Sequence, residues 1–397
     1  MLETWLPLAA GSSRLERVQP AADVRRFEPL VSDLLVVALA SDPERVLDEL
    51  SAAGTVGEAV QRSGRSLTVR YQGELIELQV AAGDEYGTAL FVATGPAAHV
   101  AEVRQRSAPR LAPRERDVYA GAGLSFIPPE LRHDPEAIDA AAAGPLPELV
   151  TPDDIRGDFH MHTTYSDGRD SIADMAAACA ALRYEYIAIT DHSVSASASR
   201  TMTVEDLARQ RDEIARVAER FPQMTILHGA EVDILPDGQL DFDDGVLEGL
   251  DVVIASLHDR AGQSGRQLTQ RCLRAIHHPL VSIISHPANR LVGRRGDYDM
   301  DYERLYAAAA ETGTVLEIDG APNHLDLDGA RARAATRAGV TVSIDSDCHR
   351  ARSLGGQMAL GVGTARRGWT EPRHTLNTRS LADVRTFVAA KRAGASG

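Results

Sequence analysis

The chain has 397 residues, 44% of them hydrophobic and 25% charged, which is typical of a folded protein with a sizeable core and often two domains. Its formal net charge of −15 excludes binding to nucleic acid through bulk charge, so any such binding needs a local basic patch. The three cysteines lie far apart, which excludes a disulfide framework and a CxxC metal site and fits a reducing compartment.

The N-terminal segment has no targeting or membrane-spanning pattern. Residues 1–13 contain Glu3 and no basic residue, unlike a secretory signal. The longest apolar run, residues 34–40, is far shorter than the roughly 20 residues that cross a bilayer. We therefore expect a cytoplasmic protein that does not associate with a membrane.

The distribution of histidine predicts where the chain divides. Ten of the 13 histidines lie between His160 and His349, whereas the first 150 residues contain only His99 and His133. Residues 140–157 are rich in Ala, Pro and Gly, which interrupts regular structure. We expect an N-terminal domain over residues 1–145, a linker over 146–156 and a C-terminal domain over 157–397.

The C-terminal part alternates between strand-like and helix-like patterns. Apolar, β-branched runs predict strands, and amphipathic runs such as residues 171–183 and 203–221 predict helices between them. The seven predicted strands are residues 158–162, 186–190, 225–230, 251–256, 280–285, 314–318 and 341–344. This alternation favours a parallel α/β arrangement, and so many strands in one region favour a distorted (β/α) barrel over an open sheet.

Residues 158–170, DFHMHTTYSDGRD, contain the first candidate site. On a strand, His160 and His162 point to the same face, as one shared cation requires. Two solvent-facing histidines give the same pattern, and for the isolated pair that interpretation is favoured. The residues after the other strands decide between the two.

Metal-binding side chains follow most of the predicted strands. The nine candidates are His160, His162, Asp167, His192, Glu231, His258, His286, Asp347 and His349. Loops at the C-terminal ends of parallel strands converge, so we expect these side chains to meet. A catalytic zinc usually takes three protein ligands, so nine nitrogen and oxygen donors suit three divalent cations, either Zn, Mn or Fe.

The segments GDFHMHTTYSDG, ITDHS, HGAEVDI, ASLHDR, ISHPANR and SDCH resemble the PHP (polymerase and histidinol phosphatase) family of metal-dependent phosphoesterases. The resemblance covers about residues 155–397 and implies a distorted seven-stranded barrel with three divalent metals, with Mn supporting activity. It implies three ligand sets: His160, His162, Glu231 and Asp347; Glu231, His258 and His286; and Asp167, His192 and His349. A water held by the first set would attack a phosphate ester.

Residues 286–295, 316–329 and 361–378 look like the PHP domain at the C-terminus of bacterial and archaeal family X DNA polymerases. The N-terminal domain then resembles a truncated α+β nucleotidyltransferase palm and thumb, without the usual helix-hairpin-helix and lyase domains. Polymerase chemistry uses carboxylates that hold two metals. Asp33 is present, but Leu35 replaces the second carboxylate and Glu77 stands for the third. We predict no polymerase activity; a scaffold and a DNA-holding platform remain equally open.

The resemblance also implies a substrate, the 3′ end of DNA. The expected activity is a 3′-5′ exonuclease, with 3′-phosphatase or 3′-phosphodiesterase activity in DNA repair as extensions. Arg290, Arg294 and Arg295 follow the fifth strand and would bind phosphate, because Arg matches phosphate oxygens. Two alternatives stay open: a small-molecule phosphatase of the histidinol-phosphatase type and a non-catalytic DNA-binding repair accessory protein.

Four more residues near the predicted strand ends complete the candidate site. Asp345, Asp319 and Asn323 would orient the ligands or the substrate. His324 stands where the resembling polymerases commonly have Arg, so a substrate contact would be altered there. The sequence predicts neither the cation used in the cell nor the oligomeric state.

Overall fold

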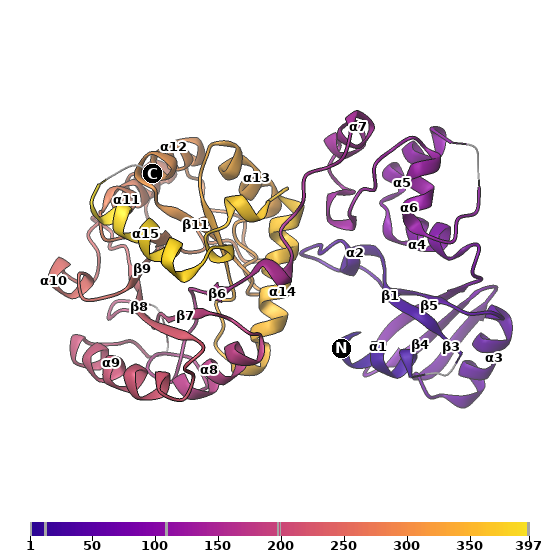
Figure 1. Ribbon diagram of the computed structural model, residues 1–397, viewed down its shortest axis with the longest axis horizontal. Helices are drawn as coiled ribbons and strands as arrows, with labels where there is room; N and C mark the ends of the chain where they lie inside the picture. Colours follow the sequence, from indigo (N-terminus) through magenta and orange to yellow (C-terminus); the bar gives the residue numbers. More distant parts are fainter. Residues whose placement is uncertain (1, 12–13, 108–109, 197, 199, 395–397) are drawn as a thin grey trace. The chain divides into compact units, whose positions relative to one another are not determined.

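The computed structural model describes residues 2–11, 14–107, 110–196, 198 and 200–394. The chain divides into two compact units, Met1–Pro147 and Glu148–Gly397 (Figure 1). Within the described ranges, no helix is both long and apolar enough to cross a membrane.

The first unit contains a five-stranded sheet with the order β1-β2-β5-β4-β3. Its strands are β1 (Glu16–Pro20), β2 (Leu34–Leu39), β3 (Glu58–Ser63), β4 (Ser66–Tyr71) and β5 (Glu74–Ala81). Its α-helices are α1 (Leu2–Ala10), α2 (Ala22–Arg25), α3 (Pro43–Ala53), α4 (Tyr86–Thr94), α5 (Ala97–Gln105), α6 (Glu115–Gly121) and α7 (Glu136–Ala143). Strands β2 and β5 are parallel, and their register pairs Leu35 with Glu77. Apolar side chains such as Trp5, Leu47 and Leu78 form the core on one face.

The second unit is a parallel α/β barrel with seven strands in the order β12-β11-β10-β9-β8-β7-β6. The strands are β6 (Gly157–Asp158), β7 (Tyr186–Ile189), β8 (Thr225–Asp233), β9 (Val252–Ser256), β10 (Ile283–Ile284), β11 (Val315–Asp319) and β12 (Val342–Asp345). The helices are α8 (Ile172–Ala181), α9 (Val204–Ala218), α10 (Asp244–Leu247), α11 (Gly265–His277), α12 (Tyr302–Thr312), α13 (Gly329–Arg337), α14 (Leu354–Arg367) and α15 (Leu381–Arg392). The mixed α/β class and the seven-stranded barrel predicted from the sequence are confirmed.

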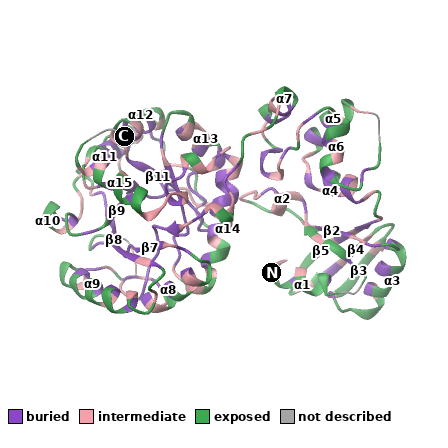
Figure 2. Cartoon of the chain, in the orientation of Figure 1, coloured by how far each residue is buried: buried purple, intermediate pink, exposed green. Residues whose placement is uncertain are grey.

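The two helices predicted from the sequence, α8 and α9, begin where expected and bury one face. In α9, the side chain of Thr203 accepts the Asp206 N–H and the Asp206 carboxylate accepts the Thr203 N–H, a capping box that fixes the helix start. Leu207, Ile214 and Val217 are buried on the side that faces the strands. Figure 2 shows the strands in the buried colour and the outer surfaces of helices such as α9 exposed.

The barrel is nearly closed. Its first and last strands, β6 and β12, lie next to each other but share few backbone hydrogen bonds. One parallel bridge joins Met161 to Cys348, and the His162 N–H donates to the Cys348 carbonyl at 2.9 Å. Side chains supply the other contacts. Asp345 accepts the Phe159 N–H at 2.8 Å, and Asp158 accepts the Ser346 N–H at 3.2 Å. These buried carboxylates therefore replace part of the missing hydrogen-bond ladder.

The two ends of the barrel differ in polarity. At the end where the strands begin, Tyr186, Leu227, Val252, Ile283 and Val315 form an apolar cluster. In that cluster the barrel packs against Val384 of α15. The polar side chains predicted to bind metals follow the other ends of the strands. The barrel therefore has one apolar, tightly packed end and one polar end, which we call the rim.

Two strands are shorter than the sequence predicts. Residues 158–162 were expected to form a strand, but β6 ends at Asp158 and only Met161 makes a further bridge. Residues 280–285 reduce to Ile283–Ile284 in β10. In the first case the candidate ligand His160 lies outside the strand, so site geometry overrides strand propensity there. In the second case the strand loses residues 280–282 at its start and Ser285 at its end.

Candidate metal centre

The rim of the barrel brings all nine candidate ligands together. His160 and His162 follow β6, and Asp167 lies in the loop after them. His192, His258 and His286 follow β7, β9 and β10, whereas Glu231 lies within β8. Asp347 and His349 follow β12. His160, His162 and Glu231 are fully or almost fully buried.

The first set brings four donor atoms close to one another. The Nε2 atoms of His160 and His162 lie 3.1 Å apart. Asp347 Oδ1 lies 3.6 and 3.1 Å from these two atoms, and Glu231 Oε2 lies 3.4 and 3.5 Å from them. Four ligands at about 2.1 Å around a tetrahedral zinc are about 3.4 Å apart. His160, His162 and Asp347 therefore lie close enough to hold one cation, with Glu231 Oε2 beside the two imidazoles.

Glu231 faces a second group of histidines through its other oxygen. Its Oε1 atom lies 3.2 Å from His258 Nε2 and 2.9 Å from His286 Nε2. The hydroxyl groups of Ser256 and Ser285 donate to the same oxygen at 2.6 and 3.2 Å. The two oxygens of one carboxylate thus point to different histidines, which is the arrangement of a bridging ligand.

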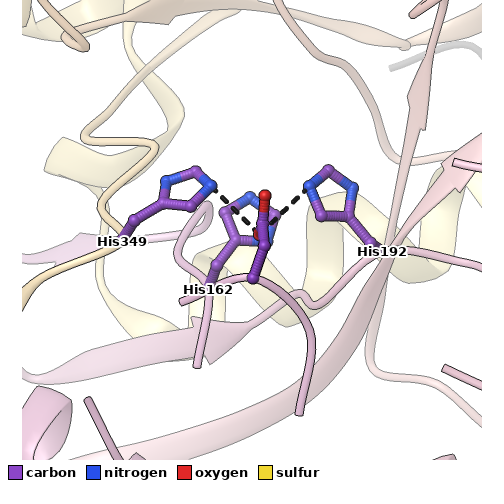
Figure 3. A group of neighbouring side chains, drawn as sticks. His162, His192 and His349 are labelled. Atoms are coloured by element: carbon purple, nitrogen blue, oxygen red, sulfur yellow. Dashed lines mark ion pairs between the residues drawn. The ribbon is translucent and has the colours of Figure 1, made fainter. Parts of the chain in front are cut away.

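The third set lies beside His162 (Figure 3). Figure 3 shows the rings of His162, His192 and His349 turned toward one another, and Asp167 Oδ1 lies 3.5 Å from His192 Nε2 and 3.2 Å from His349 Nε2. Asp167 Oδ1 is buried, and its neighbours here are the two imidazole nitrogens, as expected of a ligand in a metal site. His192 also contacts Glu231 Oε2 through Nδ1 at 2.9 Å, so it stands between two sets.

The electrostatics of the rim favour charged carboxylates next to histidines. Burial alone would raise the pKa of Glu231, but His258, His160 and His192 hold it well below its usual value. Burial would lower the pKa of His258, yet the charges of Glu231 and Asp233 outweigh it and raise the pKa to about 10. In the same way Asp167 and Asp347 raise the pKa of His349 to about 9. Without a cation, protons on His258 and His349 would offset part of the carboxylate charge.

Two carboxylates that the sequence analysis did not assign hold the candidate ligands in place. His160 Nδ1 donates to Glu317 Oε1 at 2.6 Å, and the His286 backbone N–H donates to Glu317 Oε2 at 2.7 Å. His258 Nδ1 lies 3.1 Å from both oxygens of Asp233. Such contacts fix the ring orientation and leave Nε2 for a metal. Both residues lie within strands, and the sequence gives no sign of which imidazole each one meets.

The backbone is strained at two of the candidate ligands. His286 has a φ of +26° and Asp347 a φ of +46°, a region that residues with a side chain rarely adopt. Glu317 accepts the His286 N–H and so helps to hold the first of these conformations. Strain of this kind collects at functional sites, where the position of a side chain matters more than backbone energy.

The predicted phosphate-binding arginines occupy different environments. Arg295 donates to the Asn289 backbone carbonyl and side-chain Oδ1, the latter at 2.7 Å. Arg290 donates to the His324 carbonyl at 2.9 Å and lies 3.4 Å from Asp328 Oδ2. Arg294 is exposed in the turn between them. Of the three, Arg294 is the most open to a ligand.

The predicted orienting residues also separate. Asp345 closes the barrel through the Phe159 N–H, as described above, and Asn323 is exposed, with its backbone carbonyl accepting the Val292 N–H at 2.8 Å. Asp319 is fully buried beside Asp347 and His324. The assignment of all these residues to metal or substrate remains a prediction.

The chain is similar to several known proteins. The model of the PHP domain matches residues 158–319. The DNA polymerase/3'-5' exonuclease PolX of Bacillus subtilis is 35% identical over 389 residues, which is 93% of this chain and 68% of the relative. A probable phosphatase of Syntrophotalea carbinolica is 30% identical over 207 residues, 50% of this chain and 81% of that protein. The structure of a histidinol phosphate phosphatase from Lactococcus lactis has a TM-score of 0.42 at 15% identity, covering 54% of this chain and 94% of that one.

Proposed function

The chain belongs to the family of PHP-domain proteins that includes PolX, and from this membership we propose that it removes nucleotides from the 3′ ends of DNA. Its general activity is that of a phosphate-ester hydrolase. The more specific assignment covers 3′-5′ exonuclease activity and, as extensions, removal of 3′-phosphate or 3′-phosphodiester lesions in DNA repair. A cytoplasmic location is part of the proposal.

The observation that carries the choice of DNA is the extent of the similarity. The match with PolX runs through both units and includes 93% of the chain. The match with the Syntrophotalea phosphatase includes 50%. A small-molecule phosphatase needs only the barrel, so similarity through the first unit supports a nucleic-acid substrate over a small ester.

The rim residues supply the ligand sets for three divalent cations, as proposed from the sequence. Bound Zn, Mn or Fe would lower the pKa of a coordinated water and offset negative charge on phosphoryl oxygens. Glu231 would link the first two positions, because its oxygens face His160 and His162 on one side and His258 and His286 on the other. Glu317 and Asp233 would keep His160 and His258 oriented while substrate binds.

Among the described residues, the cysteine next to the candidate ligands is not suited to act as a nucleophile. Cys348 is buried beside Asp347, its Sγ donates to the Arg350 carbonyl, and burial raises its pKa to about 12. A thiolate there is not formed at neutral pH. Water is therefore the proposed nucleophile, without a covalent intermediate. Arg290 and Arg294 are the proposed contacts for the phosphate backbone.

The first unit is proposed to have no polymerase activity. Leu35 pairs with Glu77 across β2 and β5, so an aliphatic side chain stands where a second carboxylate would have to be. Leucine cannot bind Mg²⁺, and without the second carboxylate Asp33 and Glu77 do not make up the set that holds two cations. The unit then serves either as a scaffold or as a platform that holds DNA for the barrel.

The test is cleavage of a 5′-labelled single-stranded DNA in Mn²⁺ by wild type, His162→Ala and Asp347→Ala. A ladder shortened from the 3′ end in wild type alone supports the exonuclease and its ligands together. His278→Gln is the matched control, because His278 lies 3.2 Å from Asp244 away from the rim. This variant should cleave as wild type does.

Two other outcomes would sink the proposal and name its replacement. Intact DNA with hydrolysis of a small phosphate monoester by the same residues would make the protein a small-molecule phosphatase. Binding of DNA without release of phosphate in any divalent cation would make it a DNA-binding accessory protein. Salt separates these cases further, because DNA binding weakens steeply with salt whereas hydrolysis of a small ester does not.

A further inference from the structure

A fourth group of potential ligands lies beside the first set. One ligand atom each of Asp319, His324 and Asp347 lies within 4.8 Å of the other two. Asp319 ends β11, and His324 follows in the loop before α13. Neither residue belongs to the three ligand sets described above, and Asp347 is the only member that they share.

Asp319 has an oxygen that the protein leaves without a partner. Its side chain is fully buried, Oδ1 accepts the Ala321 N–H at 2.6 Å, and Oδ2 has no hydrogen-bond partner. Asp347 and Glu317 add negative charge next to it. A buried carboxylate oxygen without a donor is costly, and two neighbouring carboxylates increase that cost. A positive charge placed next to these carboxylates would lower this free-energy cost.

His324 is held in place so that its ring faces this group. The ring stacks on His286 with centroids 5.4 Å apart and an interplanar angle of 29°. The backbone is fixed on both sides, because the N–H donates to the Ala321 carbonyl and the carbonyl accepts from Arg290, each at 2.9 Å. Nδ1 of the ring is buried and has no hydrogen-bond partner. A cation between them would give both Asp319 Oδ2 and His324 Nδ1 a partner.

We propose that Asp319, His324 and Asp347 form a further divalent-cation site next to the first ligand set, with Asp347 shared between them. One imidazole and two carboxylates suit Mn²⁺, Zn²⁺ or Fe²⁺. Three protein ligands leave room for water or for a phosphate oxygen. Because Arg290 binds the backbone of His324, the site lies on the side of the rim where phosphate binding is proposed. This last point rests on the proposed function, but cation binding itself does not.

The test is the number of Mn²⁺ equivalents bound per chain in equilibrium dialysis with metal analysis. Asp319→Asn and His324→Gln should each bind about one equivalent fewer than wild type. The double variant should lose no more than either single variant, because all three proteins lack the same site. His278→Gln is the control and should bind as many equivalents as wild type. Circular dichroism and thermal melting of the chelated proteins show whether each variant is folded.

Equal stoichiometry in wild type, Asp319→Asn and His324→Gln would overturn the proposal and leave Asp319 as a protonated, structural carboxyl. If Asp319→Asn does not fold, His324→Gln decides alone, because His324 is partly exposed. The outcome is separate from the activity test. A wild type that binds the extra equivalent but cleaves no DNA would refute the exonuclease and keep the site.

Discussion

Both units of the protein bury charge, but they balance it in different ways. In the first unit Glu115 accepts from Arg25 at 2.9 and 2.7 Å and lies 2.7 Å from Arg132 Nη1. The rings of Phe91 and Tyr119 lie 6.0 and 5.4 Å from the Arg132 guanidinium. Arginine keeps its charge at any accessible pH, so the charge of Glu115 is neutralised without a bound cation.

At the barrel rim the buried carboxylates face histidines instead. Glu231 and Asp347 each lie within 3.6 Å of several imidazole nitrogens. Histidine can release its proton near neutral pH and bind a cation in its place. The difference teaches that buried charge alone does not mark a functional site. A buried carboxylate paired with arginine indicates a structural role. A buried carboxylate paired with histidine can instead share a cation with it, once the histidine has lost its proton.

Replacing Glu231 should reduce catalytic activity more than any other substitution proposed here. Glu231→Gln removes the charge that two histidine groups share, so several kcal/mol of transition-state stabilisation and on the order of 10³-fold in kcat/KM are lost. The measurement is cleavage of 5′-labelled DNA in Mn²⁺. Glu248→Gln changes an exposed carboxylate of the same unit and should stay within about twofold of wild type. More than about one tenth of wild-type activity in Glu231→Gln would contradict the assigned role.

Replacing Arg132 should have the opposite pattern, with stability lost and catalysis kept. Arg132→Met leaves Glu115 partly uncompensated, and breaking a buried ion pair costs about 3–5 kcal/mol. Trp5 and Trp369 are the two tryptophans, so a Trp369→Phe background reports the urea transition of the first unit through Trp5 fluorescence.

The control for Arg132→Met is another arginine of the first unit that pairs at the surface. Arg114→Met removes the exposed Arg114–Asp117 pair and should barely move the midpoint, since exposed pairs contribute little. Hydrolysis of a small phosphate ester by folded Arg132→Met should match wild type within about twofold. If Arg132→Met lost as much hydrolytic activity as Glu231→Gln, the arginine cluster would belong to the active site. The difference between the two charge clusters would then be contradicted.

The residues that orient the histidines should have intermediate effects. Asp233→Asn weakens the acceptor of His258 Nδ1, and the loss of such contacts reduces metal affinity or activity by about 10- to 100-fold. Asp244→Asn is the matched control, because Asp244 contacts His278 at 3.2 Å outside the rim. Mn²⁺ titration compares the two. Equal affinities would mean that Asp233 does not orient a ligand.

The pH dependence of stability should separate the two kinds of charge cluster. In the cation-free protein the pKa values of His258 and His349 are raised to about 10 and 9. Their protonation therefore stabilises the folded state fully below the unfolded pKa of about 6.5, and this stabilisation is lost as pH rises through the folded values. Mn²⁺ replaces these protons, so the gap in Tm between loaded and chelated protein should widen from pH 6.5 to 9.

Scanning calorimetry with Mn²⁺ or a chelator measures that gap. His258→Gln removes one of the two groups and should make the increase with pH shallower. A gap that stays constant or narrows across this range would show that protons on these histidines do not compete with the cation.

The smallest effect is expected in the sheet of the first unit. Glu77→Gln should change DNA cleavage by less than about twofold, because the side chain has no second carboxylate partner across β2. Neither wild type nor Glu77→Gln should extend a primer. A loss on DNA without a loss on a small ester would identify the unit as a DNA-holding platform rather than a scaffold.

Sequence alone predicts the positions of the strands and the convergence of their ends, because period and loop placement follow from residue order. The sequence therefore predicts that His192, His258 and His286 lie at the same end of the barrel. It does not predict which carboxylate supports which ring. Glu317 contacts His160 across 157 positions of sequence, and only the closed barrel brings the two together.

The closure of the barrel is also absent from the sequence pattern. Residues 158–162 read as a full strand, yet β6 has two residues and relies on side-chain carboxylates. The use of Arg295 is unpredictable for a similar reason. Its position next to Arg294 indicates phosphate binding, but Asn289, with a φ of +44°, turns its carbonyl and side chain toward the guanidinium.

The junction between β6 and β12 gives cation binding a mechanical meaning. His160 and His162 lie on one side of this junction, and Asp347 and His349 lie on the other. Cations bound by residues from both sides would link β6 to β12, which few backbone hydrogen bonds connect. Chelation would then loosen the barrel at this junction first. The amide protons of Phe159 and Ser346 would exchange with solvent earlier than those of the long β8–β9 ladder.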